Sequence, residues 1–267
     1  CKQRLGIIKG WEGLIRPDGR ISPTISGVTT TSRLRHSGIV NVPKKDEDGK
    51  GAFFGRWMRE IFIPQPGWVM VGCDSKGNQL RQLAARIGDP EFTKAALLDK
   101  KRDGIDFHEI NRQFIDLSRT EAKNFFYGLI FGAGDNKLGK VMKKDAAAGK
   151  ERKEYYFNRI PGLRVLIENL QAEWRKTAKL EYDPDLKRKV LKNGFITGLD
   201  GRPIQVESEH AVLNYLLQSD EAIQMAAAYC WFHHQVAKRG YIHGKDWGML
   251  IWYHDEFQFE CRPEIAT

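Results

Sequence analysis

A run of cationic and aromatic residues at four-residue spacing is the part of this 267-residue chain best suited to chemistry. Arg119, Lys123, Tyr127 and Phe131 would form one slowly drifting stripe on the face of an α-helix. The two cations suit a polyphosphate, and the two rings offer a surface on which a base can stack. The stripe therefore predicts a nucleotide-binding helix.

Two acidic residues lie beside apolar runs that have the composition of buried strands. Asp74 follows Val69–Cys73, and Asp255 separates Met249–Tyr253 from Phe257–Cys261, at what we expect to be a hairpin tip. Taken singly, either acid is more often a turn or cap residue. Two carboxylates that bridge two divalent ions, however, would neutralise charge on both oxygens in a phosphoryl transfer. With the cationic stripe they predict metal-assisted nucleotidyl transfer.

The composition is that of a globular chain with a polyanionic partner. Hydrophobic residues make up 41% and charged residues 29%, and the formal net charge is +9. The four cysteines form no CxxC pair, which argues against a structural zinc array and a disulfide framework and favours a reducing cytosol. No apolar run is long enough for a membrane span, so we expect no membrane partner and a cytoplasmic location.

The remaining elements are expected from local patterns. Residues 1–67 indicate short strands and turns, with a turn at Asp18-Gly19, and within them Thr29–His36 could follow a phosphate backbone or be a solvated loop. The lysine-rich composition of residues 137–153 favours a mobile basic surface, and residues 198–203 are expected to form a turn. We expect helices over 80–87 and over most of 107–134, the latter with Ser118 as the N-cap of the helix that begins at Arg119. A further helical stretch is expected over 155–191, with breaks near Pro161-Gly162 and Asp183-Pro184. A long helix is expected over 210–240, with Ser208 as its candidate cap.

Several segments, in chain order, resemble the motifs of family A DNA polymerases. Asp74–Arg81 resembles motif A, Arg119 with Lys123 and Tyr127-Gly128 resembles motif B, and His254-Asp255-Glu256 resembles motif C. Thr31–Arg33, followed by Asn41–Pro43, is similar to the family's segment after the thumb, and Asp106–His108 is similar to the segment before the fingers helix. Gly198–Arg202 and Asn214–Gln218 are similar to the bacteriophage branch of the family. The resemblance covers essentially the whole chain.

The resemblance implies an α+β fold, the polymerase right hand, with an antiparallel palm sheet and helical fingers inserted in it. The first part of the palm would be residues 1–88, the fingers 89–197 with the motif B helix at 119–132, and the second part of the palm 198–267. We expect the thumb and the exonuclease domain to be absent from this chain and its C-terminus to be truncated.

The implied activity is template-directed DNA synthesis, in which a deoxynucleotide passes from a dNTP to a primer 3′-hydroxyl, in phage genome replication. Two Mg²⁺ ions would be the cofactor, with Mn²⁺ as a substitute. The partners would be primer–template DNA and dNTPs, and a processivity factor or a replicative helicase or primase could be a further partner. If the chain is phage-encoded, it would act in the cytoplasm of the bacterial host.

The resemblance also implies residue roles. Asp74, Asp255 and the backbone carbonyl of Ser75 would hold the metal ions, and Lys123 would give a proton to the departing pyrophosphate. The residues that would bind the dNTP are Arg119, Lys123, Tyr127, His108 and Gln79. Those that would touch DNA are Arg33, Asn214, Gln218 and His254, and those that would support the site are Glu256, Phe131 and Arg81.

Two positions depart from the family pattern together. The family usually has Glu where this chain has Gln79 and Tyr where it has Phe131, and in the family the carboxylate screens out the ribose 2′-hydroxyl and hydrogen-bonds the tyrosine. We hypothesise a compensated pair, because a buried carboxylate that loses its donor costs more than a neutral amide does. Independent drift is the alternative. Family members with tyrosine at the position of Tyr127 accept dideoxynucleotides readily, because the phenol hydroxyl can replace the missing 3′-hydroxyl contact, so the resemblance implies that chain terminators inhibit this enzyme.

Two other function classes stay open at this point. A single-subunit RNA polymerase shares the two acids and the lysine helix, although Glu256 and Tyr127 argue against it. A catalytically idle nucleic-acid-binding module is the other alternative, and the retained Asp74, Lys123 and Asp255 argue against that. Primer extension separates all three.

Overall fold

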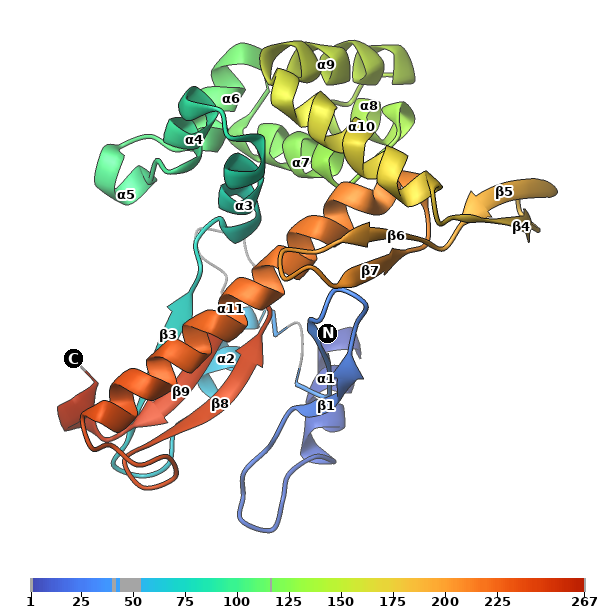
Figure 1. Cartoon of the computed structure of the whole chain (residues 1–267). Helices are drawn as coiled ribbons and strands as arrows, with labels where there is room; N and C mark the ends of the chain where they lie inside the picture. Colours follow the sequence, from blue (N-terminus) through green and yellow to red (C-terminus); the bar gives the residue numbers. More distant parts are fainter. Residues whose placement is uncertain (1, 40–41, 44–53, 116, 267) are drawn as a thin grey trace. The chain divides into compact units, whose positions relative to one another are not determined.

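The computed structural model describes residues 2–39, 42–43, 54–115 and 117–266 (Figure 1). Asn41, part of one motif named above, lies outside the described residues. The chain forms two compact units. The first unit comprises Cys1–Lys76 and Met225–Thr267, and the second comprises Gly77–Gln224.

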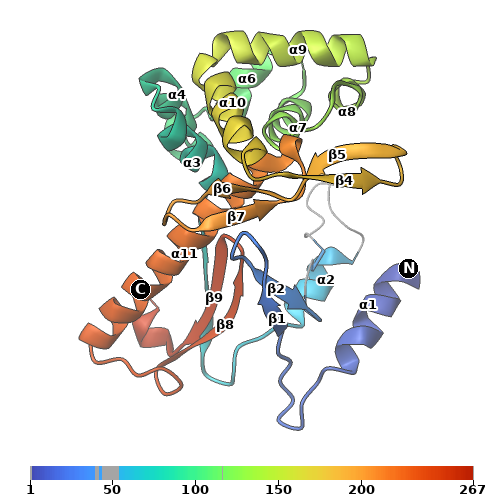
Figure 2. The ribbon, with the colours of Figure 1, turned by 45° about the vertical axis from the view of Figure 1, so that its right-hand side comes forward.

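The first unit is built on a three-stranded antiparallel sheet in the order β3-β9-β8 (Figure 1), of which Figure 2 shows β8 and β9 from another side. Its strands are β3 (Val69–Asp74), β8 (Trp247–Tyr253) and β9 (Glu256–Cys261), which confirms the strands expected from the apolar runs. Apolar side chains of the C-terminal part of helix α11 (Val212–Lys238) pack on this sheet. Phe232 stacks on Phe259 with ring centroids 4.6 Å apart, so the core fixes the strands that carry the acids.

The N-terminal part of the first unit contains two helices as well as the expected strands and turns. Strands β1 (Thr24–Val28) and β2 (Leu34–Ser37) form an antiparallel hairpin. The expectation of strands and turns alone is wrong for α1 (Lys2–Glu12) and α2 (Gly55–Glu60). In α1 only Trp11 is buried, and Gly6 and Gly10 lower the helix propensity of the segment, which explains why the helix was not expected.

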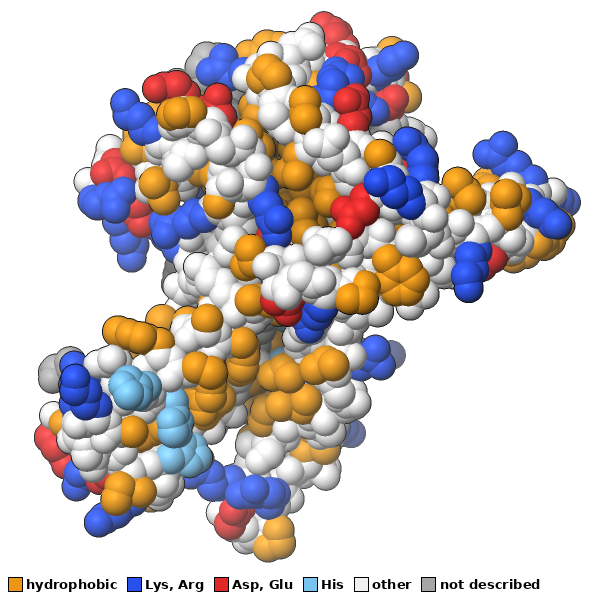
Figure 3. Space-filling view, in the orientation of Figure 1, with side chains coloured by type: hydrophobic (Ala, Val, Ile, Leu, Met, Phe, Trp, Pro, Cys, Tyr) orange, Lys and Arg blue, Asp and Glu red, His pale blue; other side chains and the backbone are white. Residues whose placement is uncertain are grey.

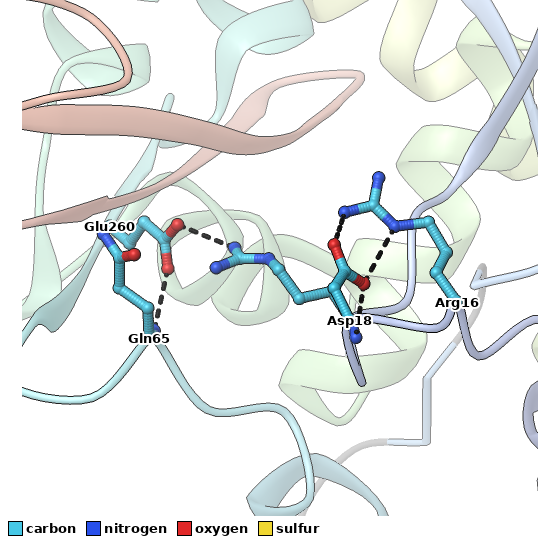
Figure 4. Close-up of polar contacts among 5 residues, drawn as sticks. Arg16, Asp18, Gln65 and Glu260 are labelled. Carbon is cyan, nitrogen blue, oxygen red and sulfur yellow. Dashed lines mark hydrogen bonds and ion pairs between the residues drawn. The ribbon is translucent and has the colours of Figure 1, made fainter.

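A buried carboxylate on β9 joins two N-terminal loops to the sheet. Glu260 is 6% exposed and accepts hydrogen bonds from the Arg20 guanidinium at 2.7 Å and the Gln65 backbone N–H at 3.0 Å (Figure 4). The neighbouring turn is the one expected at Asp18-Gly19, where the Gly19 N–H donates to the Arg16 carbonyl and the Asp18 carboxylate pairs with the Arg16 side chain.

The second unit is mainly helical. Its helices are α3 (Asn78–Ile87), α4 (Pro90–Ala96), α5 (Lys100–Asp103), α6 (Phe107–Ile115), α7 (Arg119–Ile130), α8 (Asp135–Val141), α9 (Ala146–Arg159) and α10 (Pro161–Arg175). The expected break at Pro161 is confirmed, and the basic stretch 137–153 is largely helical. Phe125, Phe126 and Trp174 are fully buried in its core.

Beyond α10 the structure corrects the sequence prediction. Residues 179–191, expected to be helical with a break near Asp183-Pro184, lie instead in a hairpin of β4 (Lys179–Asp183) and β5 (Arg188–Lys192). Pro184 lacks an N–H, and the Asp183 carboxylate accepts from the backbone of Asp185 and Leu186, which closes a turn instead of a helix. Lys and Arg side chains lie at the surface of this hairpin (Figure 3).

The described part of the chain also contains two further strands and two short 3-10 helices. Strands β6 (Gly194–Thr197) and β7 (Pro203–Val206) flank the turn expected at 198–203. Ser208 stands at the N-cap of η1 (Glu209–Ala211), which precedes α11, and its side chain makes no capping bond. Helix η2 (Pro263–Ile265) follows β9. Among the described residues, no helix is both long and apolar enough to cross a bilayer.

Candidate active site

The sheet of the first unit brings the two predicted acids together. The β3–β9 register places Asp74 opposite Glu256, and the backbone N–H of Ser75 donates to the carbonyl oxygen of Asp255 at 2.8 Å. The end of β3 and the tip of the β8–β9 hairpin are therefore joined at the residues that carry the carboxylates. Asp74, Ser75, Asp255 and Glu256 all belong to this one site.

The electrostatics of this acidic site favour a cation. Burial raises the pKa of Asp74, and the nearby carboxylates of Asp255 and Glu256 raise it further. A positive ion at the site would reverse this effect, because it stabilises the charged carboxylate. Within the described ranges, no group of three or more His, Cys, Asp or Glu side chains is arranged to hold a metal ion. Two carboxylates, with waters and substrate phosphates, suit the coordination that Mg²⁺ prefers.

The hairpin tip also gathers cationic and aromatic groups of the first unit. His254 has a left-handed backbone with φ 56°, and its ring centroid lies 6.2 Å from that of His36 on β2. Burial lowers the pKa of His254, and the charges of Arg33 and His36 lower it further. The predicted residues Arg33 and His254 are thus brought together. The sequence reasoning gave no role to His36, whose one signal was its place in the polar run 29–36.

The cationic stripe of the second unit lies on α7 as predicted. Ser118 caps the helix in a capping box, in which its side chain accepts from the Glu121 N–H and the Glu121 carboxylate accepts from the Ser118 N–H. Lys123 Nζ lies 5.8 Å from the centroid of the Tyr127 ring, and the Phe131 ring follows at 5.7 Å from Tyr127. The stripe therefore runs from the first turn to the C-cap at Phe131.

A carboxylate missed by the sequence reasoning holds Arg119 in place. The Arg119 guanidinium forms an ion pair with Asp106, and one of its hydrogen bonds is Nε to Oδ1 at 3.3 Å. Burial alone would raise the pKa of Asp106, but hydrogen bonds from Arg119 and from the Glu109 backbone lower it. The same hydrogen bond raises the pKa of Arg119. In the sequence, Asp106 belongs to the family-like segment Asp106–His108, which assigns it no role of its own.

His108 completes the cluster of the second unit as a neutral group. It is buried on α6, 9% exposed, with its ring centroid 5.6 Å from that of Tyr127. Burial lowers its pKa to about 4, helped by the charge of Lys123. The imidazole is therefore uncharged at neutral pH, and its buried Nδ1 has no hydrogen-bond partner among the described residues. His108, Arg119, Lys123 and Tyr127 form one contiguous cluster.

Other predicted residues of the second unit lie on α3 and α11. The Gln79 side-chain amide donates from Nε2 to Oε2 of Glu221 at 2.9 Å, while Arg81 is exposed on α3. Gln218 donates from Nε2 to Oδ1 of Asn214 at 2.8 Å, one helical turn away. The structure thus pairs Asn214 with Gln218, as their spacing on a helix allows. Glu221, which received no role from the sequence, is the recorded partner of Gln79.

The family profile of "DNA polymerase family A" matches residues 3–267, nearly the whole chain. The chain belongs to this family. Relatives of this family A chain include the "DNA-directed DNA polymerase" of Enterobacteria phage T3 and that of Escherichia phage T7, each 30% identical over 269 residues. Each alignment covers 96% of the chain and 37% of the relative, so the chain spans little more than a third of their length.

A solved structure shares the fold of this family A chain. It is the "POL domain of Pol1 from M. smegmatis complex with DNA primer-template and dNTP", with a TM-score of 0.76 and 22% identity. The match covers 98% of the chain and 45% of that structure. The expected α+β polymerase fold, with an antiparallel sheet and a helical unit, is thereby confirmed.

Proposed function

We propose that this family A chain carries out template-directed DNA synthesis, transferring a deoxynucleotide from a dNTP to a primer 3′-hydroxyl in phage replication. The observation that carries the proposal is the junction of β3 with the β8–β9 hairpin, where Asp74 and Asp255 meet although 181 positions separate them (255 − 74 = 181). The phage relatives, which are named DNA-directed DNA polymerases, support it.

In the first unit, Asp74 and Asp255 with the carbonyl of Ser75 would hold two Mg²⁺ ions, and Mn²⁺ could replace them. When bound, such ions neutralise charge on the attacking and leaving oxygens. The raised pKa of Asp74 fits this role, since the neighbouring carboxylates repel its charge and a bound cation would offset that repulsion. Glu256, opposite Asp74 in the sheet, would support the site.

In the second unit, Arg119, Lys123 and His108 would bind the triphosphate of the incoming nucleotide. Lys123 is exposed and would give a proton to the departing pyrophosphate. His108, neutral because its pKa is about 4, would contribute a hydrogen bond and no charge. Arg119 would exchange part of its ion pair with Asp106 for the phosphates. Tyr127 would pack on the sugar and base, with Phe131 behind it.

The remaining assignments concern the DNA and the division of the chain. Arg33, His254, Asn214 and Gln218 would contact primer–template DNA, and the formal net charge of +9 supports such a contact. Palm segments over 1–88 and 198–267, with fingers over 89–197, would be the functional division, which need not coincide with the compact units. A processivity factor or a helicase or primase would be a further partner in the host cytoplasm.

Primer extension tests the proposed function. The chain is given a primed DNA template and Mg²⁺ with either dNTPs or rNTPs, beside Asp255→Ala and, as a matched acidic control of the same unit, Asp18→Ala. Asp18 is an exposed turn residue paired with Arg16. We expect extension with dNTPs that Asp255→Ala abolishes and Asp18→Ala retains. Extension with rNTPs alone would favour an RNA polymerase, and DNA binding without extension would favour an idle module.

A further inference from the structure

Helices α3 and α11 of the second unit are joined by a seam of polar side chains. The contacts of this seam are Gln79 with Glu221, Gln82 with Gln224, and Arg86 with Asp220. The residues on α3 recur at three- and four-residue spacing, so they share one face of that helix. The seam therefore fixes the face of α3 that carries Gln79.

The two acids of the seam are buried next to each other. Asp220 is 0% exposed and Glu221 is 2% exposed. Asp220 receives both hydrogen bonds of a bidentate pair, from Nε and Nη2 of Arg86, each at 2.8 Å. The charge of Arg86 is thereby engaged by Asp220. Glu221 accepts a hydrogen bond from the side-chain amide of Gln79.

This arrangement determines how the amide of Gln79 is oriented. A carboxylate accepts hydrogen bonds only, so Glu221 holds the NH₂ end of the amide at 2.9 Å and turns the carbonyl end away. A glutamate at position 79 would bring a second carboxylate to the same place, where two like charges cannot both remain ionised at such a short distance. The residue type at position 79 is thus tied to Glu221.

We infer that Glu221 is a positioning residue for Gln79, and that the pair sets discrimination between deoxyribose and ribose in the incoming nucleotide. The inference rests on the proposed function, in which Gln79 belongs to the dNTP site. It names Glu221, and not Phe131, as the residue whose identity makes glutamine the suitable side chain at position 79. Phe131 has no hydrogen-bonding side-chain atom, whereas the Glu221 carboxylate accepts a hydrogen bond from the amide.

Exchanging donor and acceptor tests the inference. The variants are Gln79→Glu, Glu221→Gln, both together, and Gln79→Glu with Phe131→Tyr. The matched control is Gln82→Glu, the same change on the same seam opposite the neutral Gln224. The readout is kcat/KM for a dNTP divided by kcat/KM for the matching rNTP, with the thermal midpoint of each variant recorded alongside.

We expect Gln79→Glu to lower the discrimination ratio by about tenfold, the effect of losing one hydrogen bond to a charged group. Glu221→Gln added to it should restore the ratio to within about threefold, because the amide introduced at position 221 can then donate to the carboxylate introduced at position 79, with the roles reversed. Gln82→Glu should leave the ratio unchanged.

The inference is overturned if the discrimination ratio of Gln79→Glu with Glu221→Gln is no higher than that of Gln79→Glu alone. It is also overturned if Phe131→Tyr, and not Glu221→Gln, restores the ratio of Gln79→Glu. A purely structural role for Glu221 would move the thermal midpoint and leave the ratio alone, which also overturns it. In each of these cases the parent still extends primers, so the proposed function stands. A parent that extends no primer overturns the proposed function itself, and the sugar-selection role falls with it.

Discussion

Replacing Arg86 by methionine should destabilise the second unit strongly, because it leaves a buried carboxylate without its counter-ion. The Asp220 carboxylate has 0% exposure and receives two hydrogen bonds of 2.8 Å from Arg86. Removing one partner of such a pair costs about 3–5 kcal/mol. The Arg86 side chain is 28% exposed, so water can reach part of the site and the lower end, about 3 kcal/mol, is expected.

Thermal unfolding followed by circular dichroism measures this effect. A loss of about 3 kcal/mol corresponds to a midpoint lowered by roughly 6–12 °C for a chain of this size. The double variant Arg86→Met with Asp220→Leu should recover most of the loss, because both charges leave together. Arg102→Met, which removes an exposed arginine paired with Asp103 in the same unit, is the matched control and should change little.

The reasoning would be refuted by either of two results. One is a midpoint for Arg86→Met as high as that of Arg102→Met, which would mean that the buried carboxylate does not depend on its guanidinium. The other is a double variant as unstable as Arg86→Met alone, which would mean that the loss comes from packing of the arginine stem and not from the stranded charge.

Three further outcomes are expected. Ser118→Ala should lower stability by about 1 kcal/mol in urea unfolding, since it removes the capping box of α7, and no change would show that the cap is dispensable. The pKa of His108 is lowered to about 4, so the stability that its neutral form contributes should be full above pH 6.5 and should be lost as the pH falls from about 6.5 to about 4. A nuclear magnetic resonance titration of His108 with a midpoint near 6.5 would contradict this. Tyr127→Phe should reduce dideoxynucleotide incorporation in primer extension, and equal incorporation would remove the role given to the phenol hydroxyl.

Elements with a strong local signal were predictable from the sequence. The apolar runs before Asp74 and around Asp255 specified β3, β8 and β9, and the Ser118 cap with Glu121 specified the start of α7. These features depend on residues close together in the chain. The meeting of Asp74 with Asp255 was expected from the chemistry of paired carboxylates and from the resemblance of the motifs to a known family, not from local pattern, and the β3–β9 register now accounts for it.

Elements with a weak or mixed signal were missed. Helix α1 buries only Trp11, and its glycines Gly6 and Gly10 weaken the helical signal of its sequence. The β4–β5 hairpin is rich in lysine and arginine, which favour helices, and its apolar residues Leu180 and Tyr182 are 66% and 62% exposed. Alternation along such a short and exposed strand is hard to distinguish from a helical face. Cross-strand pairing, including Leu180 with Leu191, outweighs the local propensity there.

The partners of the site residues form the part that no local pattern could show. Ser219, Asp220 and Glu221 are three consecutive polar residues on α11, a composition that is typical of a solvated face, yet they are 0%, 0% and 2% exposed. The burial of the two acids is tolerable because Arg86 reaches Asp220 and Gln79 reaches Glu221 from α3, 134 and 142 positions earlier in the chain. The same holds for Asp106, which pairs with Arg119 across 13 positions that include helix α6. A charged side chain can be buried only where an oppositely charged or hydrogen-bonding partner lies beside it, and a partner distant in the sequence can be identified only from the folded structure.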